Sequence, residues 1–385
     1  MARRRVLLYT QSLSGTGHFV QTYEIAQALA PAHDVHLVDG GRAIPRPPPA
    51  HPFALLPLPA IYRAQGKLAP VDPTHGLDVI MGQRRRALRQ ALGRIQPDVV
   101  VIEHFPFSKW DLEGEILSVI DEARVAKPGV KVVCSLRDIP PGSADNPAAP
   151  DYQDYVRRIL RTYFDLLLVH SDPRLIQLEE HIPWAETIPI PIAYTGYVSE
   201  KLGKRPAGAG IPAAGGAGGH VIVSTGGASR LSLLRHTVDA WRHLDARGAT
   251  GNRSLIVVLP PFARRDELDG LPVEHESIRL EPFTPGFLPW MATADLSISQ
   301  AGYNTCANVL ETRSRAILVP NPSMYDQPPR ARRLVQRGLT RAMDLERLDP
   351  DGLAATILEA LAAPRPVHDV DLDGARRSCE LLATL

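Results

Sequence analysis

Residues 7–30, "LLYTQSLSGTGHFVQTYEIAQALA", pass from an apolar run through a glycine-containing turn into an amphipathic helix. The run Arg5–Thr10 has the pattern of a strand buried on both faces of a parallel sheet. Gly15 and Gly17 permit the turn, and apolar residues then recur at helical spacing. A strand, a turn and a helix in this order predict an α/β fold.

His18 stands where this turn becomes the helix. Ligands of open α/β sheets bind at the carboxyl ends of the strands, so a side chain here is presented to a ligand. The alternative is a solvated histidine at a helix start. Gly15, Thr16 and Gly17 form the loop that would lie beside the same ligand.

The strand pattern recurs along the first half of the chain, with helical stretches such as Met81–Ile95 between the strands. The further candidate strands are "DVHLVDG", "PDVVVIEH", "KVVCSLRD" and "DLLLVHSD". A second series follows, comprising "HVIVSTGGAS", "SLIVVLPPF", "SIRLEPF", "ADLSISQAG" and "RAILVPNP", with helices expected at Leu231–Arg247 and Asn304–Thr312. The pattern predicts two doubly wound, Rossmann-like α/β domains that face each other across a ligand cleft.

A segment rich in glycine, proline and alanine divides the two series. We therefore expect an N-terminal domain over residues 1–202, a linker over 203–219 and a C-terminal domain over 220–365. Residues 366–385 are expected to form a terminal helix.

Composition narrows the function. The 385-residue chain has 43 Lys and Arg residues against 42 Asp and Glu residues, a net charge of +1. The chain as a whole therefore has no strong positive electrostatic field that would attract nucleic acid. Its three cysteines lack metal or disulfide spacing, as suits a reducing cytoplasm. No apolar run is long enough to span a membrane, and no secretion signal is expected; peripheral contact with the inner face of the membrane stays open.

Two local segments have plain structural interpretations. The basic run Arg84–Arg89 is expected to form a solvated helix face rather than an anion site. The proline-rich run Pro45–Pro52 is expected to be an irregular surface loop rather than a docking segment.

The second half contains two turns suited to an anion. Gly226, Gly227 and Ser229 follow a strand and precede a helix, where backbone N–H groups can approach a phosphate. Gly302 opens a second such turn, and the helix after it begins with Asn304 and Thr305 and carries Glu311 two turns later. A carboxylate can accept hydrogen bonds from a ribose, although Glu311 taken alone is better explained as a surface or pairing carboxylate.

The segments "GYVSE", "STGGAS" and "SQAGYNTCANVLETRSRAILVPNP", followed by Asp326–Gln327, resemble glycosyltransferases related to MurG (family 28 type), which have the GT-B fold. The match is most specific over residues 196–361. In the first half, "SGTGH" resembles the family's glycine-rich loop but has Thr16 where a further glycine is usual. "VVVIEHFPF" and "VVCSLRDI" look closer to uncharacterised bacterial predicted glycosyltransferases.

The resemblance implies a nucleotide-diphospho sugar bound to the second domain without a metal or other cofactor. Gly226, Gly227 and Ser229 would meet the diphosphate or sugar, and Thr305 would support the phosphates. The remaining donor contacts that it implies are Glu311 on the ribose, the backbone near Phe283 on the base, and Asp326 with Gln327 on the sugar hydroxyls.

Three side chains of the first domain are candidates for the catalytic base. His18 has a suitable pKa, while Glu103 and Asp138 end two strands and could either act as the base or orient His18. His104 and Arg137 adjoin these carboxylates in sequence and complete the acceptor side.

Residues Asp369–Glu380, "DVDLDGARRSCE", match the spacing of a calcium loop. Two prolines precede the match and only five residues follow it, so the flanking helices of a calcium-binding hand are not expected. We expect Asp371 or Asp373 to cap the last helix instead. The family resemblance implies that this helix packs back across the domain junction.

The sequence thus predicts a metal-independent inverting glycosyltransferase that uses a nucleotide sugar, UDP-sugar favoured over dTDP- or GDP-sugar. The acceptor, small or lipid-linked, and the oligomeric state are not specified by the sequence. The alternatives are a nucleotide-sugar epimerase or hydrolase on the same fold, and a non-catalytic partner of another glycosyltransferase.

Overall fold

The computed structural model describes residues 3–46, 48–141, 150–203, 219–227, 231–263, 271, 275–284 and 287–385. The chain forms two compact units, the first comprising Met1–Ser199 with Asp371–Leu385 and the second comprising Glu200–Val370. Of the expected linker, residues 204–218 lie outside the described residues.

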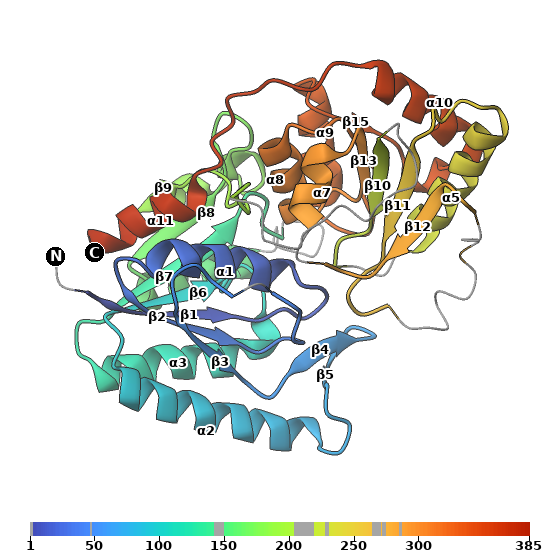
Figure 1. The fold of residues 1–385 in the computed structure, drawn as a ribbon. Coiled ribbons are helices and arrows are strands. Elements are labelled where there is room, and N and C mark those ends of the chain that lie inside the picture. The colour runs from blue at the N-terminus through green and yellow to red at the C-terminus, as the bar shows by residue number, and fades with distance from the viewer. Residues whose placement is uncertain are drawn as a thin grey trace. The chain divides into compact units, whose positions relative to one another are not determined.

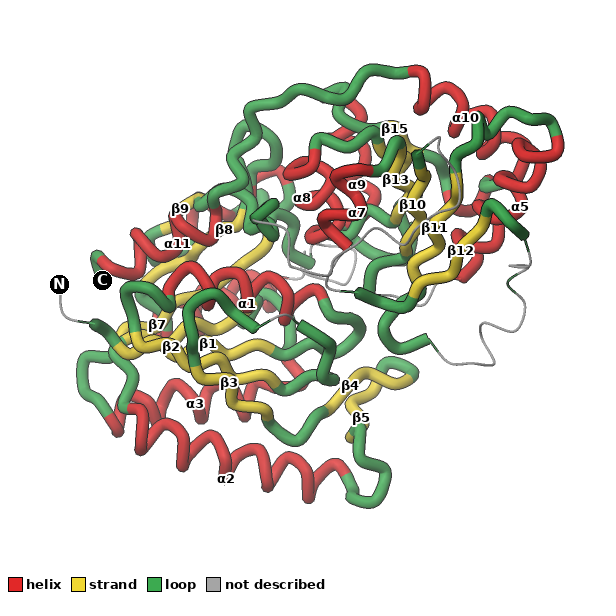
Figure 2. The backbone as a smooth tube through the Cα atoms, in the orientation of Figure 1, coloured by secondary structure: helices red, strands yellow, loops and turns green. Residues whose placement is uncertain are grey.

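The first unit is built on a parallel sheet of order β3-β2-β1-β6-β7-β8-β9 (Figures 1 and 2). The strands are β1 Arg5–Thr10, β2 Asp34–Asp39, β3 Ala54–Pro57, β6 Val99–Glu103, β7 Lys131–Arg137, β8 Leu166–His170 and β9 Ile192–Tyr194. Strand order reverses between β1 and β6, because the chain builds outward from β1 in one direction and then restarts beside it.

Helices cover both faces of this sheet, as the figures show. They are α1 Gly17–Leu29, α2 Leu77–Ile95, α3 Glu113–Ala126, α4 Pro150–Tyr163 and α11 Gly374–Ala383. Alternate β1 residues enter separate cores: Val6 and Leu8 pack with α1 and α11, whereas Leu7 and Tyr9 pack with α2 and α3. Burial on both faces explains why the strands read as continuous apolar runs.

A small antiparallel hairpin, β4 Ile61–Ala64 and β5 Lys67–Pro70, stands apart from the main sheet. This hairpin, β3 and β9 lack the long apolar pattern by which the other strands of the first unit are predicted. The described residues of the proline-rich run Pro45–Pro52 form no helix or strand, as expected, and Pro47 lies outside the described residues.

The expectation for Arg84–Arg89 is wrong at its first residue. The Arg84 side chain is fully buried and binds Glu115, with nitrogen–oxygen distances of 2.7 and 2.9 Å. It also donates to the Gln11 side chain and to the Pro59 carbonyl oxygen. Arg84 faces the sheet because it falls on the apolar stripe of α2 with Leu88 and Leu92.

The second unit contains a parallel sheet of order β12-β11-β10-β13-β14-β15. Its strands are β10 His220–Ser224, β11 Ser254–Val258, β12 Ile278–Glu281, β13 Leu296–Ser299, β14 Ala316–Leu318 and β15 Arg341–Ala342. Its helices include α5 Leu231–Ala246, α7 Phe287–Thr293, α8 Tyr303–Thr312, α9 Gln327–Gln336 and α10 Pro350–Ala362. Strand order here reverses between β10 and β13.

The last helix, α11, belongs to the first unit and packs against α1 (Figure 1). Asp373 occupies its N-cap position, but the Asp373 side chain makes no capping hydrogen bond. The Asp371 side chain accepts a hydrogen bond of 2.9 Å from the Asp373 backbone N–H instead. A β-bridge between Val198 and Asp373 ties the start of α11 to the same unit.

No helix within the described ranges is long and apolar enough to cross a membrane.

Candidate active site

The site in the first unit lies at the reversal point of its sheet. His18 lies at the start of α1, the helix that follows β1, and Glu103 is the last residue of β6, the strand paired with β1. Parallel strands end at the same edge, so the two side chains meet although 85 residues separate them. Such a reversal point is the usual ligand position in open α/β sheets.

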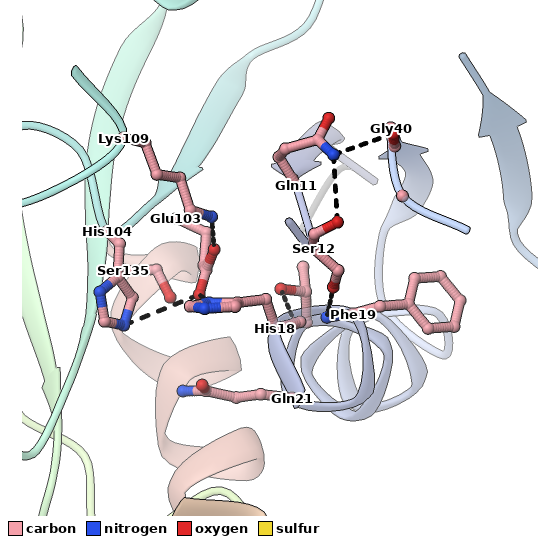
Figure 3. A network of polar contacts seen from close by, with 12 residues as sticks. Gln11, Ser12, His18, Phe19, Gln21, Gly40, Glu103, His104, Lys109 and Ser135 are labelled. Atoms are coloured by element: carbon pink, nitrogen blue, oxygen red, sulfur yellow. Dashed lines mark hydrogen bonds and ion pairs between the residues drawn. The ribbon is translucent and has the colours of Figure 1, made fainter. Parts of the chain in front are cut away.

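The turn into α1 holds His18 in place. Thr16 occupies the N-cap without a capping hydrogen bond from its side chain. The Ser12 hydroxyl accepts a hydrogen bond of 3.1 Å from the Phe19 backbone N–H, in place of a conventional cap (Figure 3). His18 is consequently fixed as the second residue of the helix, with Gly17 the first.

His18 and Glu103 form a close hydrogen-bonded pair, joined through Nδ1 of the ring and Oε1 of the carboxylate (Figure 3). We assign the proton to Nδ1, because an ionised carboxylate can only accept. This tautomer leaves Nε2 with its lone pair. The ring retains 29% of its surface exposure, whereas the carboxylate retains 2%.

Lys109 contacts the other carboxylate oxygen. Its Nζ donates to Oε2 of Glu103, and its side chain is only 5% exposed (Figure 3). Glu103 therefore lies between an imidazole and an ammonium group, one on each oxygen.

His104 places a second imidazole beside this pair. Its ring lies edge-on to that of His18 with the centroids 5.0 Å apart. Both ring nitrogens are buried without a hydrogen-bond partner, although Nε2 is 3.7 Å from Oε1 of Glu103. The backbone of His104 is left-handed, with φ +64°, a conformation that costs energy and is often found at functional sites.

Burial and charge set the protonation of these groups. Burial lowers the pKa of His18 to about 4; the Arg137 and Lys109 charges act in the same direction, while Glu103 opposes them. Burial also lowers the pKa of His104 well below its usual range. For Glu103, burial disfavours the anion, but His18 and Lys109 outweigh it and hold its pKa well below the ordinary value.

The other two candidates at this edge are held by different contacts. Arg137 donates from Nε to the Gln21 side chain at 2.7 Å, which links the end of β7 to α1. Asp138 is fully buried; it accepts hydrogen bonds from the Ile139 backbone N–H at 2.8 Å and the Tyr197 hydroxyl at 3.1 Å. Glu103 is thus the carboxylate that the structure brings to His18 Nδ1.

One atom from each of His18, Glu103 and His104 lies within 4.8 Å of the others, a separation that a metal ion could bridge. The Lys109 ammonium group already supplies a positive charge to the same carboxylate. The sequence-based expectation of a metal-free site stays a prediction.

The second unit gathers three of the expected donor residues at its own reversal point. A Cβ on Gly226 would lie 3.5 Å from the Thr305 hydroxyl, and one on Gly302 would lie 3.9 Å from it. Gly226 has φ +63°, a conformation that favours glycine. The turns after β10 and β13 thus converge on the first residues of α8.

Polar atoms without hydrogen-bond partners are buried at the same edge. They include Oγ1 of Thr225, directly after β10, and Nε2 of Gln300, directly after β13. Ser224 of β10 pairs with Ser299 of β13, so Thr225 and Gln300, the next residue of each strand's chain, lie side by side. Buried polar atoms without partners are costly, and a polar ligand bound at this edge would satisfy these two.

Asp326 and Gln327 lie at the start of α9. One oxygen of Asp326 pairs with Arg330 at 2.8 Å, and the other is buried without a hydrogen-bond partner. The Gln327 side-chain oxygen accepts a hydrogen bond of 2.9 Å from the Asn321 backbone N–H. Both side chains are therefore partly engaged by the protein.

Glu311 forms an ion pair of 3.0 Å with Lys201 and retains 14% exposure. Asn304 is the second residue of α8, and Gly227 follows Gly226 in its turn. Phe283 lies two residues beyond β12, at the same edge of the sheet. Ser229 lies outside the described residues.

Sequence reasoning missed Lys109, Thr225 and Gln300. Lys109 sits in a loop without a motif, so no sequence signal indicated its contact with Glu103. Thr225 and Gln300 stand inside the quoted glycine turns, and their position directly after a strand was the available signal.

Residues 262–367 match the model of the glycosyltransferase family 28 C-terminal domain. The matched residues all lie within the second unit. The prediction of a glycosyltransferase resembling this family is thereby confirmed. No curated protein matches the chain.

Solved structures that resemble the chain over nearly its whole length include a glycosyltransferase of kitacinnamycin, the glycosyltransferase VinC and a putative epimerase. The glycosyltransferase of kitacinnamycin has a TM-score of 0.63 and 17% identity, covering 100% of this chain and 99% of that one. Glycosyltransferase VinC in complex with dTDP has a TM-score of 0.58 and 13% identity, covering 98% and 94%. A putative UDP-N-acetylglucosamine 2-epimerase from Listeria monocytogenes has a TM-score of 0.56 and 13% identity, covering 100% and 96%. The predicted GT-B fold, with two Rossmann-like units, is confirmed.

Proposed function

We propose that this glycosyltransferase moves a sugar from a nucleoside-diphospho sugar to an acceptor hydroxyl, with inversion at the anomeric carbon and without a metal ion. The observation that carries the proposal is the His18–Glu103 pair at the reversal point of the first sheet. A neutral imidazole oriented by a carboxylate is suited to remove a hydroxyl proton.

In this mechanism Nε2 of His18 accepts the acceptor's hydroxyl proton while the oxygen forms a bond to the anomeric carbon. The bond from that carbon to the diphosphate breaks on the opposite side, and the nucleoside diphosphate leaves with the electron pair. Glu103 stays ionised and stabilises the imidazolium that forms. A single displacement of this kind inverts the configuration.

The donor binds the second unit through the turns around Gly226 and Gly302. The N-terminal end of α8 presents backbone N–H groups and a positive dipole end to the diphosphate, with the Thr305 hydroxyl beside both glycines. Preorganised donors of this kind stabilise the charge on a leaving group without a cation.

The remaining donor contacts follow the family resemblance. Gly227 and Ser229 extend the diphosphate or sugar contacts, and Asn304 accompanies Thr305 at the helix start. The Phe283 backbone reads the base and Asp326 with Gln327 binds sugar hydroxyls. Glu311 would bind the ribose, exchanging its Lys201 contact for the ligand.

UDP-sugar is the donor that the resemblance favours, and dTDP-sugar is the main competitor because VinC is a complex with dTDP. GDP-sugar is the third member of the test panel. We place the reaction in the cytoplasm, consistent with free cysteines at positions 134, 306 and 379.

An epimerase or hydrolase is the second candidate, favoured by the likeness to the Listeria epimerase. An epimerase would return the nucleotide sugar with one altered centre. A hydrolase would release free sugar whether or not an acceptor is present. A non-catalytic partner would bind the nucleotide sugar and leave it unchanged.

The test is a panel of UDP, dTDP and GDP and their sugars, scored by the rise in melting temperature in excess EDTA, since a ligand of the native state raises apparent stability. The stabilising sugar is then incubated with an acceptor library and the products are identified by mass spectrometry. A glycosylated acceptor supports the proposal. An epimerised donor, free sugar alone in every mixture, or an unchanged donor supports one of the alternatives.

A further inference from the structure

We propose that Lys109 is a positioning residue, which keeps Glu103 ionised and in place so that His18 carries its proton on Nδ1 and leaves Nε2 unprotonated. This role rests on the proposed function for its purpose, but the contacts that support it do not. Lys109 and His18 bind opposite oxygens of one buried carboxylate (Figure 3).

The charges of the cluster explain why Lys109 keeps His18 neutral. Glu103 and Lys109 together form a neutral pair that is almost fully buried. Protonation of His18 would add a positive charge to this pair. A second positive charge beside the buried Lys109 ammonium is disfavoured, so the cluster is most stable with neutral His18.

The charged and titratable groups around the cluster also favour a neutral His18. Arg137 at the end of β7 adds a further positive charge near His18 and His104. His104, directly after β6, is itself buried and resists protonation. Burial lowers the pKa of Lys109, and the charges of Glu103 and of Asp39 at the end of β2 oppose that shift.

Lys109 is held by its backbone as well as by its ion pair. Its φ is +67°, a left-handed conformation that is uncommon for lysine. It directly precedes the 3₁₀ turn η1, Trp110–Leu112, and its carbonyl oxygen accepts a hydrogen bond of 2.9 Å from the Leu112 backbone N–H. This geometry fixes the point from which the ammonium reaches Glu103.

Removal of the Lys109 charge leaves Glu103 as a buried anion beside two imidazole rings, of which His18 is the one that already hydrogen-bonds the carboxylate. The Glu103–His18 pair should then take up a proton at a higher pH. A charge at this range shifts a pKa by about one unit or more, so Lys109→Met should raise the pH of the His18 transition by about that amount.

The measurement is a pH titration of histidine ring nitrogens by ¹⁵N NMR in the full chain, with His18 assigned by its loss in His18→Ala. Lys109→Met is compared with Lys109→Arg, which retains the charge and should titrate like wild type. Lys131→Met is the control, because it removes a lysine paired with Asp165 at 3.1 Å at the opposite end of β7. It should leave His18 unchanged.

An unchanged His18 transition in folded Lys109→Met would overturn the proposal, as would a wild-type His18 that is protonated at neutral pH. If Lys109→Met does not fold, Lys109→Gln provides the same loss of charge. None of these readouts needs turnover. If Lys109→Met shifts the His18 transition as expected but His18→Ala is fully active, only the proposed function is overturned. If the His18 transition in Lys109→Met is unchanged but His18→Ala is inactive, only the role of Lys109 is overturned.

Discussion

At the scale of single residues, His18 and Glu103 show what one sequence can and cannot specify. Each was predictable as a side chain at the carboxyl end of a buried strand, because that position follows from the apolar pattern. Which carboxylate would reach His18 was not predictable, because it depends on strand order: β6 lies beside β1, whereas Asp138 follows β7. The contact of Lys109 depends on a loop conformation that no spacing rule describes.

His18→Ala should reduce turnover by about 10²–10⁴-fold, the usual contribution of a general base, and leave donor affinity near wild type. Steady-state kinetics with the acceptor found by the screen, together with calorimetry of the donor, separate the two effects. His36→Ala, in β2 and paired with Asp34, is the matched control. Wild-type turnover in His18→Ala with an inactive Asp138→Asn would instead assign the base to Asp138.

The pH dependence of kcat/KM should be that of a histidine with a lowered pKa. The base works only when unprotonated, so activity falls as the pH drops through the His18 pKa. An ordinary histidine with a pKa near 6.5 is mostly protonated at about pH 6, whereas His18, with a pKa of about 4, stays neutral there. We therefore expect kcat/KM to fall only below about pH 5. A fall centred near the ordinary histidine pKa would contradict the environment described for His18.

At the scale of elements, the strands were easier to predict than the order of the strands in the sheet or the buried polar contacts between helices. The run Arg5–Thr10 was predicted with both ends correct, since burial on both faces gives an unambiguous apolar pattern. The buried arginine of α2 was misassigned, because a basic residue on an apolar stripe looks like part of the exposed face until its partner is known. That partner, Glu115, lies on α3, 31 residues away.

Arg84→Met should destabilise the first unit by about 3–5 kcal/mol, because it leaves Glu115 buried without its cation. Urea unfolding measures the loss. Arg89→Met is the control: it lies on the same helix and pairs with Glu122 on the same neighbour, but its side chain is 71% exposed. Its loss should be small. Equal losses for the two variants would show that burial of the Arg84 pair is not what makes it important.

At the scale of the whole molecule, repetition of the α/β pattern was sufficient to predict two Rossmann-like units. Their strand order was not predictable from apolar runs alone, yet it determines the chemistry. Each unit reverses direction beside its first strand, between β1 and β6 in one and between β10 and β13 in the other. His18 with Glu103, and Gly226 with Gly302, occupy those two reversal points.

The central claim is a metal-independent transfer with inversion, and the most direct test is the anomeric configuration of the product. ¹H NMR of the glycosylated acceptor, formed in excess EDTA from a donor of known configuration, gives the answer through the coupling of the anomeric proton. The account predicts product of the opposite configuration to the donor, formed at the same rate with and without EDTA. Product of retained configuration, or activity that EDTA abolishes and Mg²⁺ or Mn²⁺ restores, would contradict it.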